Sequence, residues 1–238
     1  MIKQAIILAA GGGTRLRPLT NNCPKPMLTI NGKPLLVYQL EALVQAGIID
    51  VVIHVAYLAD KIINTIKDGR QYGLNMNITY ATIDEPLETG GGLAFCLAKL
   101  PKQDEPFICI NGKIFTDYNY SNLADINLGE NMAHMILVPN PPENLEGDYN
   151  LTDHNYLVKK SVDHYHNFTF SGIAVYDAKL LREQLASITE QKFSIIKIIN
   201  NNLDRVSGSV YNGIWYGLET VEQYNSLNQQ YSIISEHL

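Results

Sequence analysis

The sequence predicts an α/β fold in which a mostly parallel, mixed sheet is flanked by helices. Short apolar runs rich in β-branched residues, typical of buried strands, alternate with segments in which leucine and isoleucine recur every three or four residues. The second pattern is that of a helix with one buried face. No repeat, low-complexity tract or linker-like stretch divides the chain, so residues 1–238 are expected to form a single domain.

The expected elements follow one another along the whole chain. Strands are expected at residues 6–8, 51–55, 78–81, 107–110, 135–138, 168–175 and 206–211. Helices are expected at residues 35–44, 58–66, 180–185, 193–199 and 220–238, and a further helix is expected to start at the glycine cluster 90–92 and to continue to residue 100. Gly47 follows the first helix where a C-terminal cap would lie, and Asp68 and Gly69 end the second. Residues 139–165 are rich in Pro, Asn, Asp and His, and their short alternating runs predict a hairpin near the functional site.

Composition and charge narrow the class of protein. The chain has 238 residues, with 18 basic and 24 acidic residues and a net charge of −6, which argues against nonspecific nucleic-acid binding. No apolar run approaches the roughly 20 residues that span a bilayer, and glycines interrupt the first apolar run before it resembles a signal peptide. The three cysteines form no CxxC pair and are expected to be free thiols. We therefore expect a cytoplasmic protein that binds neither nucleic acid nor a membrane, and no feature indicates a particular oligomeric state.

A glycine-rich, basic loop follows the first expected strand. Residues 11–13 are glycines, which let backbone N–H groups approach a ligand closely. Thr14 adds a hydroxyl group, and Arg15 and Arg17 add guanidinium groups suited to phosphate oxygens. The loop lacks both the Gly-Lys-Ser/Thr end of a Walker loop and the GxGxxG spacing of dinucleotide-binding proteins. It therefore predicts phosphate binding of another kind.

Residues 8–20, Leu-Ala-Ala-Gly-Gly-Gly-Thr-Arg-Leu-Arg-Pro-Leu-Thr, together with Pro-Lys-Pro at 24–26, resemble the signature of the sugar-1-phosphate nucleotidyltransferases. The resemblance implies a Rossmann-like nucleotide-diphospho-sugar transferase fold. It also implies attack of a sugar-phosphate oxygen on the α-phosphorus of a nucleoside triphosphate, with release of pyrophosphate. Catalytic roles are implied for Arg15, on the β- and γ-phosphates, and for Lys25, near the α-phosphate and the sugar phosphate. The nucleotide-binding residues that the resemblance implies are Ala10, Gly11, Gly12, Gly13, Thr14, Gly91 and Gly92.

Later segments resemble a narrower group of this family, the uridylyltransferases that act on N-acetylmuramate α-1-phosphate in peptidoglycan recycling. The shared segments are Leu-Glu-Thr-Gly-Gly-Gly at 87–92, Asn-Gly at 111–112, Thr-Asp-Tyr at 116–118, Gly-Asp-Tyr at 147–149 and Phe-Ser-Gly-Ile at 170–173. The first of these lies between a strand and the start of a helix, which Thr89 could also cap, and a tight turn between the two elements is the alternative explanation of its glycines. The residues that would face the sugar phosphate are Glu88, Asn111, Asp148 and Ser171. Asp148 also fits an ordinary turn.

The chain departs from the family pattern where that pattern places its metal-binding aspartates. Lys113 stands after Asn-Gly at 111–112, and Gly217 stands in Trp-Tyr-Gly-Leu-Glu-Thr before the last helix. The resemblance implies Mg²⁺ as cofactor, but Mg²⁺ requires hard oxygen ligands and a lysine at this spot repels it. We therefore expect no metal-ligating residues here and assign Lys113 as a third catalytic cation. Of the nearby carboxylates, Asp117 already belongs to the family pattern, and Glu219 is expected to open the last helix.

Two hypotheses of function follow. In the first, Lys113 replaces the metal as a tethered cation, and the chain transfers a nucleotidyl group, preferably from UTP, to a sugar-1-phosphate, preferably N-acetylmuramate 1-phosphate. In the second, the chain binds a nucleotide and a sugar phosphate but has lost most turnover. Cytidylyl or guanylyl transfer stays open within the first hypothesis, because backbone groups make much of the contact with the base. Ile83, where relatives often carry a polar residue near the base, is a further departure.

Overall fold

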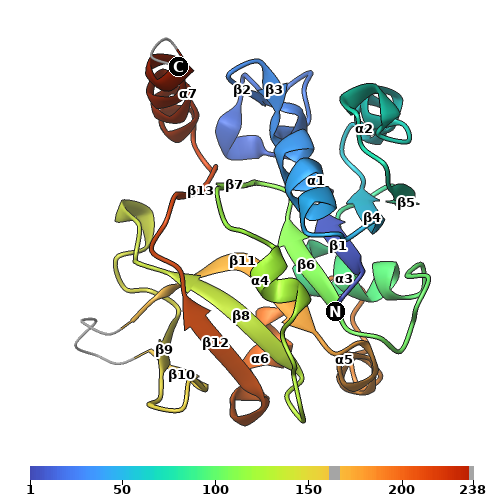
Figure 1. Ribbon diagram of the computed structural model, residues 1–238, viewed down its shortest axis with the longest axis vertical. Coiled ribbons are helices and arrows are strands. Elements are labelled where there is room, and N and C mark those ends of the chain that lie inside the picture. Colours follow the sequence, from blue (N-terminus) through green and yellow to red (C-terminus); the bar gives the residue numbers. More distant parts are fainter. Residues whose placement is uncertain (161–166, 236–238) are drawn as a thin grey trace.

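A seven-stranded mixed sheet forms the centre of the computed structural model, which describes residues 1–160 and 167–235 (Figure 1). The strands, in the spatial order β12-β8-β11-β6-β1-β4-β5, are β12 (Val206–Val210), β8 (Ala133–Val138), β11 (Thr169–Tyr176), β6 (Phe107–Asn111), β1 (Gln4–Leu8), β4 (Asp50–Val55) and β5 (Asn77–Thr82). Neighbouring strands from β6 to β5 are parallel, whereas β11 runs antiparallel to both β6 and β8. The expected α/β class and mixed sheet are confirmed.

Helices cover both faces of the sheet, because successive residues of a strand point to opposite faces. Ile7 of β1 belongs to a core that also contains residues of α1, α2 and α4, whereas its neighbour Ile6 packs with residues of α3, α5 and α6. The helices are α1 (Leu35–Gln45), α2 (Ala59–Ile66), α3 (Glu88–Leu97), α4 (Ser121–Ala124), α5 (Ala178–Leu185), α6 (Ile196–Asn200) and α7 (Val221–Ser235).

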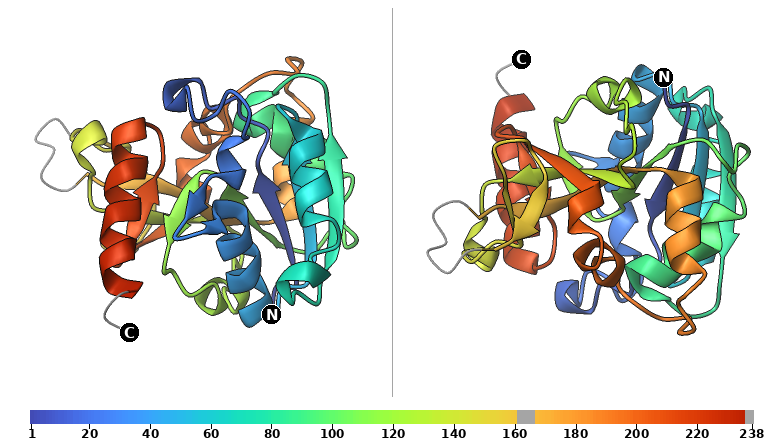
Figure 2. Two further views of the ribbon diagram at one scale, coloured as in Figure 1. Left: turned by 90° about the horizontal axis from the view of Figure 1, so that it is seen from above. Right: turned by 90° about the horizontal axis from the view of Figure 1, so that it is seen from below.

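Three two-stranded sheets lie outside the seven-stranded sheet and pair segments that do not belong to it. They are β2 (Thr29–Ile30) with β3 (Lys33–Pro34), β7 (Ile114–Thr116) with β13 (Trp215–Gly217), and β9 (Tyr149–Leu151) with β10 (Leu157–Lys159). Helix α7 lies at one end of the molecule, apart from both helical layers (Figure 2), and its Leu227 packs with Ile30 and Leu218. The β7–β13 pair matters most for function, because it brings the residues before α7 beside those that follow β6.

The elements agree closely with those expected from the sequence. Each expected strand is present, and none of its ends differs from the expected one by more than two residues, a normal uncertainty at element ends. The expected hairpin is present as β9 and β10, although residues 161–165 of that segment lie outside the described residues. The last helix begins at Val221, and residues 236–238 of its expected range also lie outside them.

The helix expected to start at the glycines of residues 87–92 is present, and the alternative of a tight turn at these residues is wrong. Helix α3 already begins at Glu88, so the three glycines form part of its first turns and are buried. Thr89 does not cap the helix; its Oγ1 instead accepts a hydrogen bond of 3.0 Å from the backbone N–H of Ile195. The segment is therefore a tightly packed helix start and not an open glycine loop.

Close packing explains why these positions are glycines. A Cβ on Gly91 would overlap the backbone carbonyl oxygen of Gln191, and a Cβ on Gly92 would lie 2.6 Å from Cδ2 of His54. Both neighbours are fixed, one as backbone and the other as a ring in the core, so neither position has room for a methyl group.

No helix among the described residues combines the length and the apolar character needed to cross a membrane. The three cysteines are free thiols, as expected. Burial raises the pKa of Cys96 to about 12, which makes this thiol unreactive at neutral pH.

We expect Gly91→Ala to lower the free energy of unfolding by about 1–3 kcal/mol, because the added methyl group overpacks the contact with Gln191. Gly12→Ala is the matched control, since a Cβ there meets nothing within 4 Å. Urea denaturation of both variants measures the difference. Equal stability of the two would show that α3 packs less tightly against residue 191 than the structure indicates.

Candidate active site

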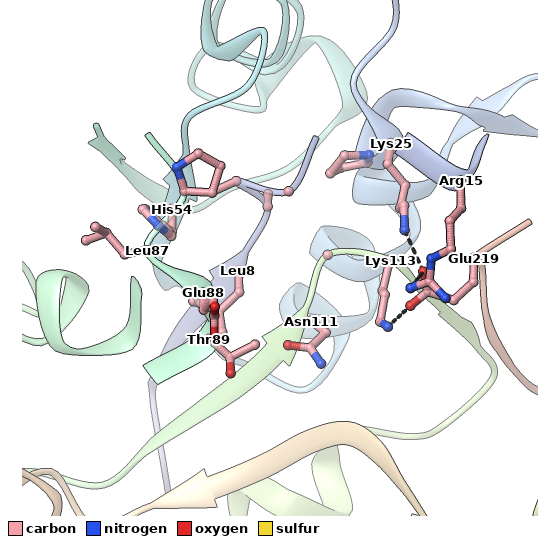
Figure 3. A pocket seen from close by; sticks show the side chains of 16 residues that line it. Leu8, Arg15, Lys25, His54, Leu87, Glu88, Thr89, Asn111, Lys113 and Glu219 are labelled. Carbon is pink, nitrogen blue, oxygen red and sulfur yellow. Dashed lines mark hydrogen bonds and ion pairs between the residues drawn. The ribbon is translucent and has the colours of Figure 1, made fainter. Parts of the chain in front are cut away.

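A cavity of about 310 Å³ lies at the carboxyl ends of β1, β4 and β6, the edge of a parallel sheet at which α/β proteins bind ligands (Figure 3). Its lining residues are Leu8, Ala9, Ala10, Gly11, Arg15, Lys25, Pro26, His54, Pro86, Leu87, Glu88, Thr89, Asn111, Gly112, Lys113 and Glu219. The charged groups of Arg15, Lys25, Lys113 and Glu219 gather on one side of this first cavity, and His54, Leu87, Glu88 and Thr89 lie on the other (Figure 3). The cavity thus has a cationic side and a largely uncharged side.

The glycine-rich loop after β1 forms part of this first cavity. Ala10, Gly11 and Arg15 line it, whereas Gly12, Gly13 and Thr14 belong to the same loop but not to the lining. Gly13 adopts a φ of 58°, and a Cβ there would lie 2.9 Å from Cγ2 of Thr20, so this position requires glycine. The turn at Gly13 starts the short 3₁₀ helix Thr14–Leu16 that carries Arg15 into the site.

Three cations converge on one carboxylate in the first cavity. Arg15 Nη2 lies 2.7 Å and Lys25 Nζ 3.2 Å from Oε2 of Glu219, while Lys113 Nζ bonds Oε1. We call these four residues the charged cluster. The side chains of Lys25 and Glu219 are only 12% and 15% exposed, whereas that of Arg15 is 70% exposed. The cluster brings together four separate segments, and its three positive charges and one negative charge leave two positive charges uncompensated.

The pKa values in the charged cluster follow from burial and from the ion pairs. Burial lowers the pKa of Lys25, although the attraction of Glu219 opposes this effect. Burial alone would raise the pKa of Glu219, but the hydrogen bond and attraction of Lys113, with those of Lys25, outweigh it and hold the pKa below its ordinary value. Glu219 is therefore ionised at neutral pH.

The expectation that Glu219 opens the last helix is incomplete, because its side chain points into the first cavity and bonds the three cations. Its backbone N–H donates to Oε1 of Gln223, and the N–H of Thr220 donates to the same oxygen, so Gln223 supplies the cap. The carboxylate is left to the three cations. Sequence reasoning missed this role of Glu219. The signal that could have revealed it is that one chain combines a lysine at position 113 with a glutamate at position 219.

A second, larger cavity of about 650 Å³ adjoins the first, and Asn111, Lys113 and Glu219 line both. The predicted sugar-phosphate residues divide between the two cavities. Glu88 lines the first alone, Asn111 lines both, and Asp148 and Ser171 line the second alone. The charged cluster therefore stands at the junction of two adjoining cavities.

The polar atoms of Asp148 and Ser171 already have partners in the fold. Asp148 Oδ2 accepts a hydrogen bond of 2.8 Å from the backbone N–H of Phe170, and Oδ1 accepts one from Asn144. Ser171 Oγ donates to the carbonyl of Ile136 at 2.7 Å and is buried. Both residues shape the wall of the second cavity, and their side chains are bonded to protein groups.

Other predicted residues lie away from the first cavity. Gly91 and Gly92 are buried in α3 and are not among its lining residues, and Ile83 lines a separate apolar groove that Gly91 also borders. His54, by contrast, lines the first cavity although sequence reasoning did not select it. Its Nδ1 donates to the carbonyl of Ala81, so Nε2 is unprotonated; burial lowers the pKa of this histidine. Nε2 has no hydrogen-bond partner among the described residues.

The residues at the junction do not fit a magnesium ion. Within the described ranges, no group of three or more His, Cys, Asp or Glu side chains could hold a metal. Lys113 places a cation on the carboxylate of Glu219, and Gly217 in the wall of the second cavity offers no ligand. The donor set is that of a site for an anion, because its charged hydrogen-bond donors outnumber its carboxylates three to one.

The chain is similar in sequence to known nucleotidyltransferases. The sequence profile of a family described as nucleotidyl transferase matches residues 4–232. An N-acetylmuramate alpha-1-phosphate uridylyltransferase from Neisseria meningitidis is 37% identical over 224 residues, which cover 92% of this chain and 94% of that protein. A mannose-1-phosphate guanyltransferase from Candida albicans is 37% identical over 135 residues, which cover 56% of this chain and 37% of that protein.

Solved structures share the fold. A Bacillus anthracis protein provisionally assigned as a glucose-1-phosphate thymidylyltransferase, in complex with sucrose, matches 97% of this chain and 95% of its own, with a TM-score of 0.82 and 20% identity. HddC from Yersinia pseudotuberculosis in complex with GMP-PN matches 97% of this chain and all of its own, with a TM-score of 0.73 and 22% identity. These likenesses confirm the expected Rossmann-like transferase fold.

We expect Glu219→Gln to lower the free energy of unfolding at pH 7 by about 1–3 kcal/mol, because three cations lose their shared partner. The folded-state pKa of Glu219 lies below its ordinary value of 4.5, so its contribution is present above that value and is lost as the pH falls through the folded-state pKa. The deficit of the variant should therefore shrink toward acid pH.

Urea denaturation at several pH values between 3 and 7 measures this difference. Glu183→Gln removes an exposed carboxylate of α5 that lies outside the charged cluster and serves as the control. A deficit that stays constant down to acid pH would show that Glu219 does not stabilise the fold through its charge.

Proposed function

Because the chain belongs to the nucleotidyl transferase family, we propose that it joins a nucleoside triphosphate to a sugar-1-phosphate and releases pyrophosphate. UTP and N-acetylmuramate 1-phosphate are the favoured pair. The relative from N. meningitidis supports this choice, since it is an N-acetylmuramate alpha-1-phosphate uridylyltransferase and the match covers nearly all of both chains. The C. albicans relative acts on mannose 1-phosphate as a guanyltransferase, so the choice of base and sugar needs direct measurement.

The position of the charged cluster carries the proposal. It lies where the two cavities meet, so a triphosphate in the first cavity and a sugar phosphate in the second would bring their phosphate groups to the same cations. Both reactants are polyanions, and their mutual repulsion is the main obstacle to bringing them within reaction distance. Cations fixed at the junction lower that obstacle.

The reaction requires positioning and neutralisation of charge more than covalent help from the protein. A sugar-phosphate oxygen attacks the α-phosphorus, the bond from that phosphorus to the bridging oxygen breaks, and pyrophosphate leaves with the electron pair. Arg15 would contact the leaving phosphates and Lys25 the α-phosphate. Lys113, on the wall that both cavities share, would neutralise charge between the two reactants as a tethered cation.

A second candidate function is binding of the two ligands without turnover. The observation that favours it is the charged cluster itself, in which a carboxylate already holds the cations and the described part of the chain provides no metal-ligand set beside them. Pyrophosphate release, measured with UTP, GTP, CTP and dTTP against several sugar 1-phosphates, separates the two functions. Calorimetric binding of UTP without release from any pair would leave only the binding protein.

We expect Lys113→Met to lower pyrophosphate release about 10²–10³-fold, as removal of a single transition-state donor does in other enzymes. Activity of the unmodified chain should persist in EDTA, because Lys113 does not depend on a bound metal. Lys179→Met, which changes an exposed lysine of α5, is the control. A steep millimolar requirement for Mg²⁺ in the unmodified chain would contradict the role of Lys113.

We expect the double variant Lys113→Asp with Gly217→Asp to become dependent on Mg²⁺, because it places two carboxylates at the junction. A Cβ at position 217 would lie 2.9 Å from Cη2 of Trp215, so the indole must move by a few tenths of an ångström. Metal titration followed by calorimetry and by the rate of pyrophosphate release tests this. If the double variant gains neither metal binding nor rate, positions 113 and 217 are not equivalent to metal-binding positions of the family.

A further inference from the structure

We infer that Glu219 is the resident anion of a phosphate site, and that its carboxylate leaves Arg15, Lys25 and Lys113 when a phosphate group of a metal-free polyphosphate takes its place. The inference deepens the proposed function and rests on it for the identity of the natural ligand. The affinity of this protein for a triphosphate is then set by an exchange of one anion for another inside the cluster.

The donors of the charged cluster suit a phosphate group better than a carboxylate. Two carboxylate oxygens are shared by three cation heads, and Oε2 accepts from both Arg15 and Lys25. A terminal phosphate has three oxygens and more negative charge, so each cation could have an oxygen of its own. The two uncompensated positive charges of the cluster provide the attraction for this larger anion.

The cations have anchors other than Glu219. Lys25 stands between Pro24 and Pro26, which restrict its backbone, and its side chain is largely buried. The carbonyl of Lys113 accepts a hydrogen bond of 3.0 Å from the backbone N–H of Leu218, which fixes the segment that carries it. The attachment points of the two lysines therefore stay in place when the carboxylate leaves.

The second cavity provides space for the Glu219 carboxylate when it leaves the cations. Among the described residues, only the three cation heads bond it, while its backbone N–H is fixed by Gln223. Glu219 lines both cavities, and rotation about its side-chain torsions takes the carboxylate toward the second cavity, whose volume is about 650 Å³. Departure therefore requires a change of rotamer and no movement of the backbone.

The two effects of Glu219 on a ligand oppose each other. The carboxylate gathers three like charges in advance, which favours binding, but the ligand must displace it, which disfavours binding. Because the two lysines have their own anchors, we infer that displacement is the larger effect. Removal of the carboxylate should then raise the affinity for polyphosphate.

Inorganic tripolyphosphate is the probe, because it has no base or sugar and can only report on the phosphate site. Calorimetry in EDTA at pH 7 compares the unmodified chain with Glu219→Gln, and we expect about tenfold or greater tightening in the variant. Glu222→Gln, which removes an equal charge outside the cluster, should change the affinity less than twofold. Equal or weaker binding by Glu219→Gln, or equal tightening by Glu222→Gln, overturns the inference.

A measurement on the unmodified chain guards against a variant that fails to fold. Crystals soaked in tripolyphosphate should show a phosphate group on Lys113 Nζ, with the Glu219 carboxylate moved away from it. A carboxylate that still bonds all three cations, or a cluster without phosphate, overturns the inference.

The outcomes also separate this inference from the proposed function. If tripolyphosphate displaces Glu219 but no substrate pair releases pyrophosphate, the exchange stands and the transferase activity fails. If pyrophosphate is released while Glu219→Gln leaves tripolyphosphate affinity unchanged, the activity stands and the exchange fails.

Discussion

The attraction between one carboxylate and three cations holds together the part of this protein where its two cavities meet. The sheet creates the meeting point, because β1 and β6 are parallel neighbours and their following loops emerge at the same edge. Arg15 comes from the first loop and Lys113 from the second. The β7–β13 pair then brings Glu219 beside them. Without its carboxylate, the three positive charges that now bond it would lie close together and repel one another.

Much of the fold follows from the sequence, because its signals are local. The β-branched run 51–55 and the helical spacing of 35–44 each specify an element without reference to the rest of the chain, and both elements are present. The glycines at 11–13 mark the loop after β1 for the same reason, and Arg15 and Lys25 could be assigned to the site from their motifs. The order of the strands required the structure, since neighbouring strands come from distant parts of the sequence.

The parts that sequence patterns could not show depend on contacts between distant segments. Glycines at 90–92 look the same in sequence whether they cradle a ligand or admit a close neighbour, and the contacts with His54, Gln191 and Phe193 reveal that they admit neighbours. Glu219 and Lys113 are 106 positions apart, so their ion pair cannot be read from spacing. Asp148 resembles a ligand-binding residue in its motif, but its carboxylate is bonded to the backbone of β11.

The charged cluster also makes positions 113 and 219 depend on each other. A lysine at 113 without Glu219 would face Arg15 and Lys25 as a third like charge, because these three side chains share that one carboxylate. A glutamate at 219 without Lys113 would still have two cations beside it. Loss of the carboxylate is therefore costlier in a chain that carries Lys113 than in one that lacks it, so the two side chains form a unit that tolerates joint replacement better than replacement of Glu219 alone.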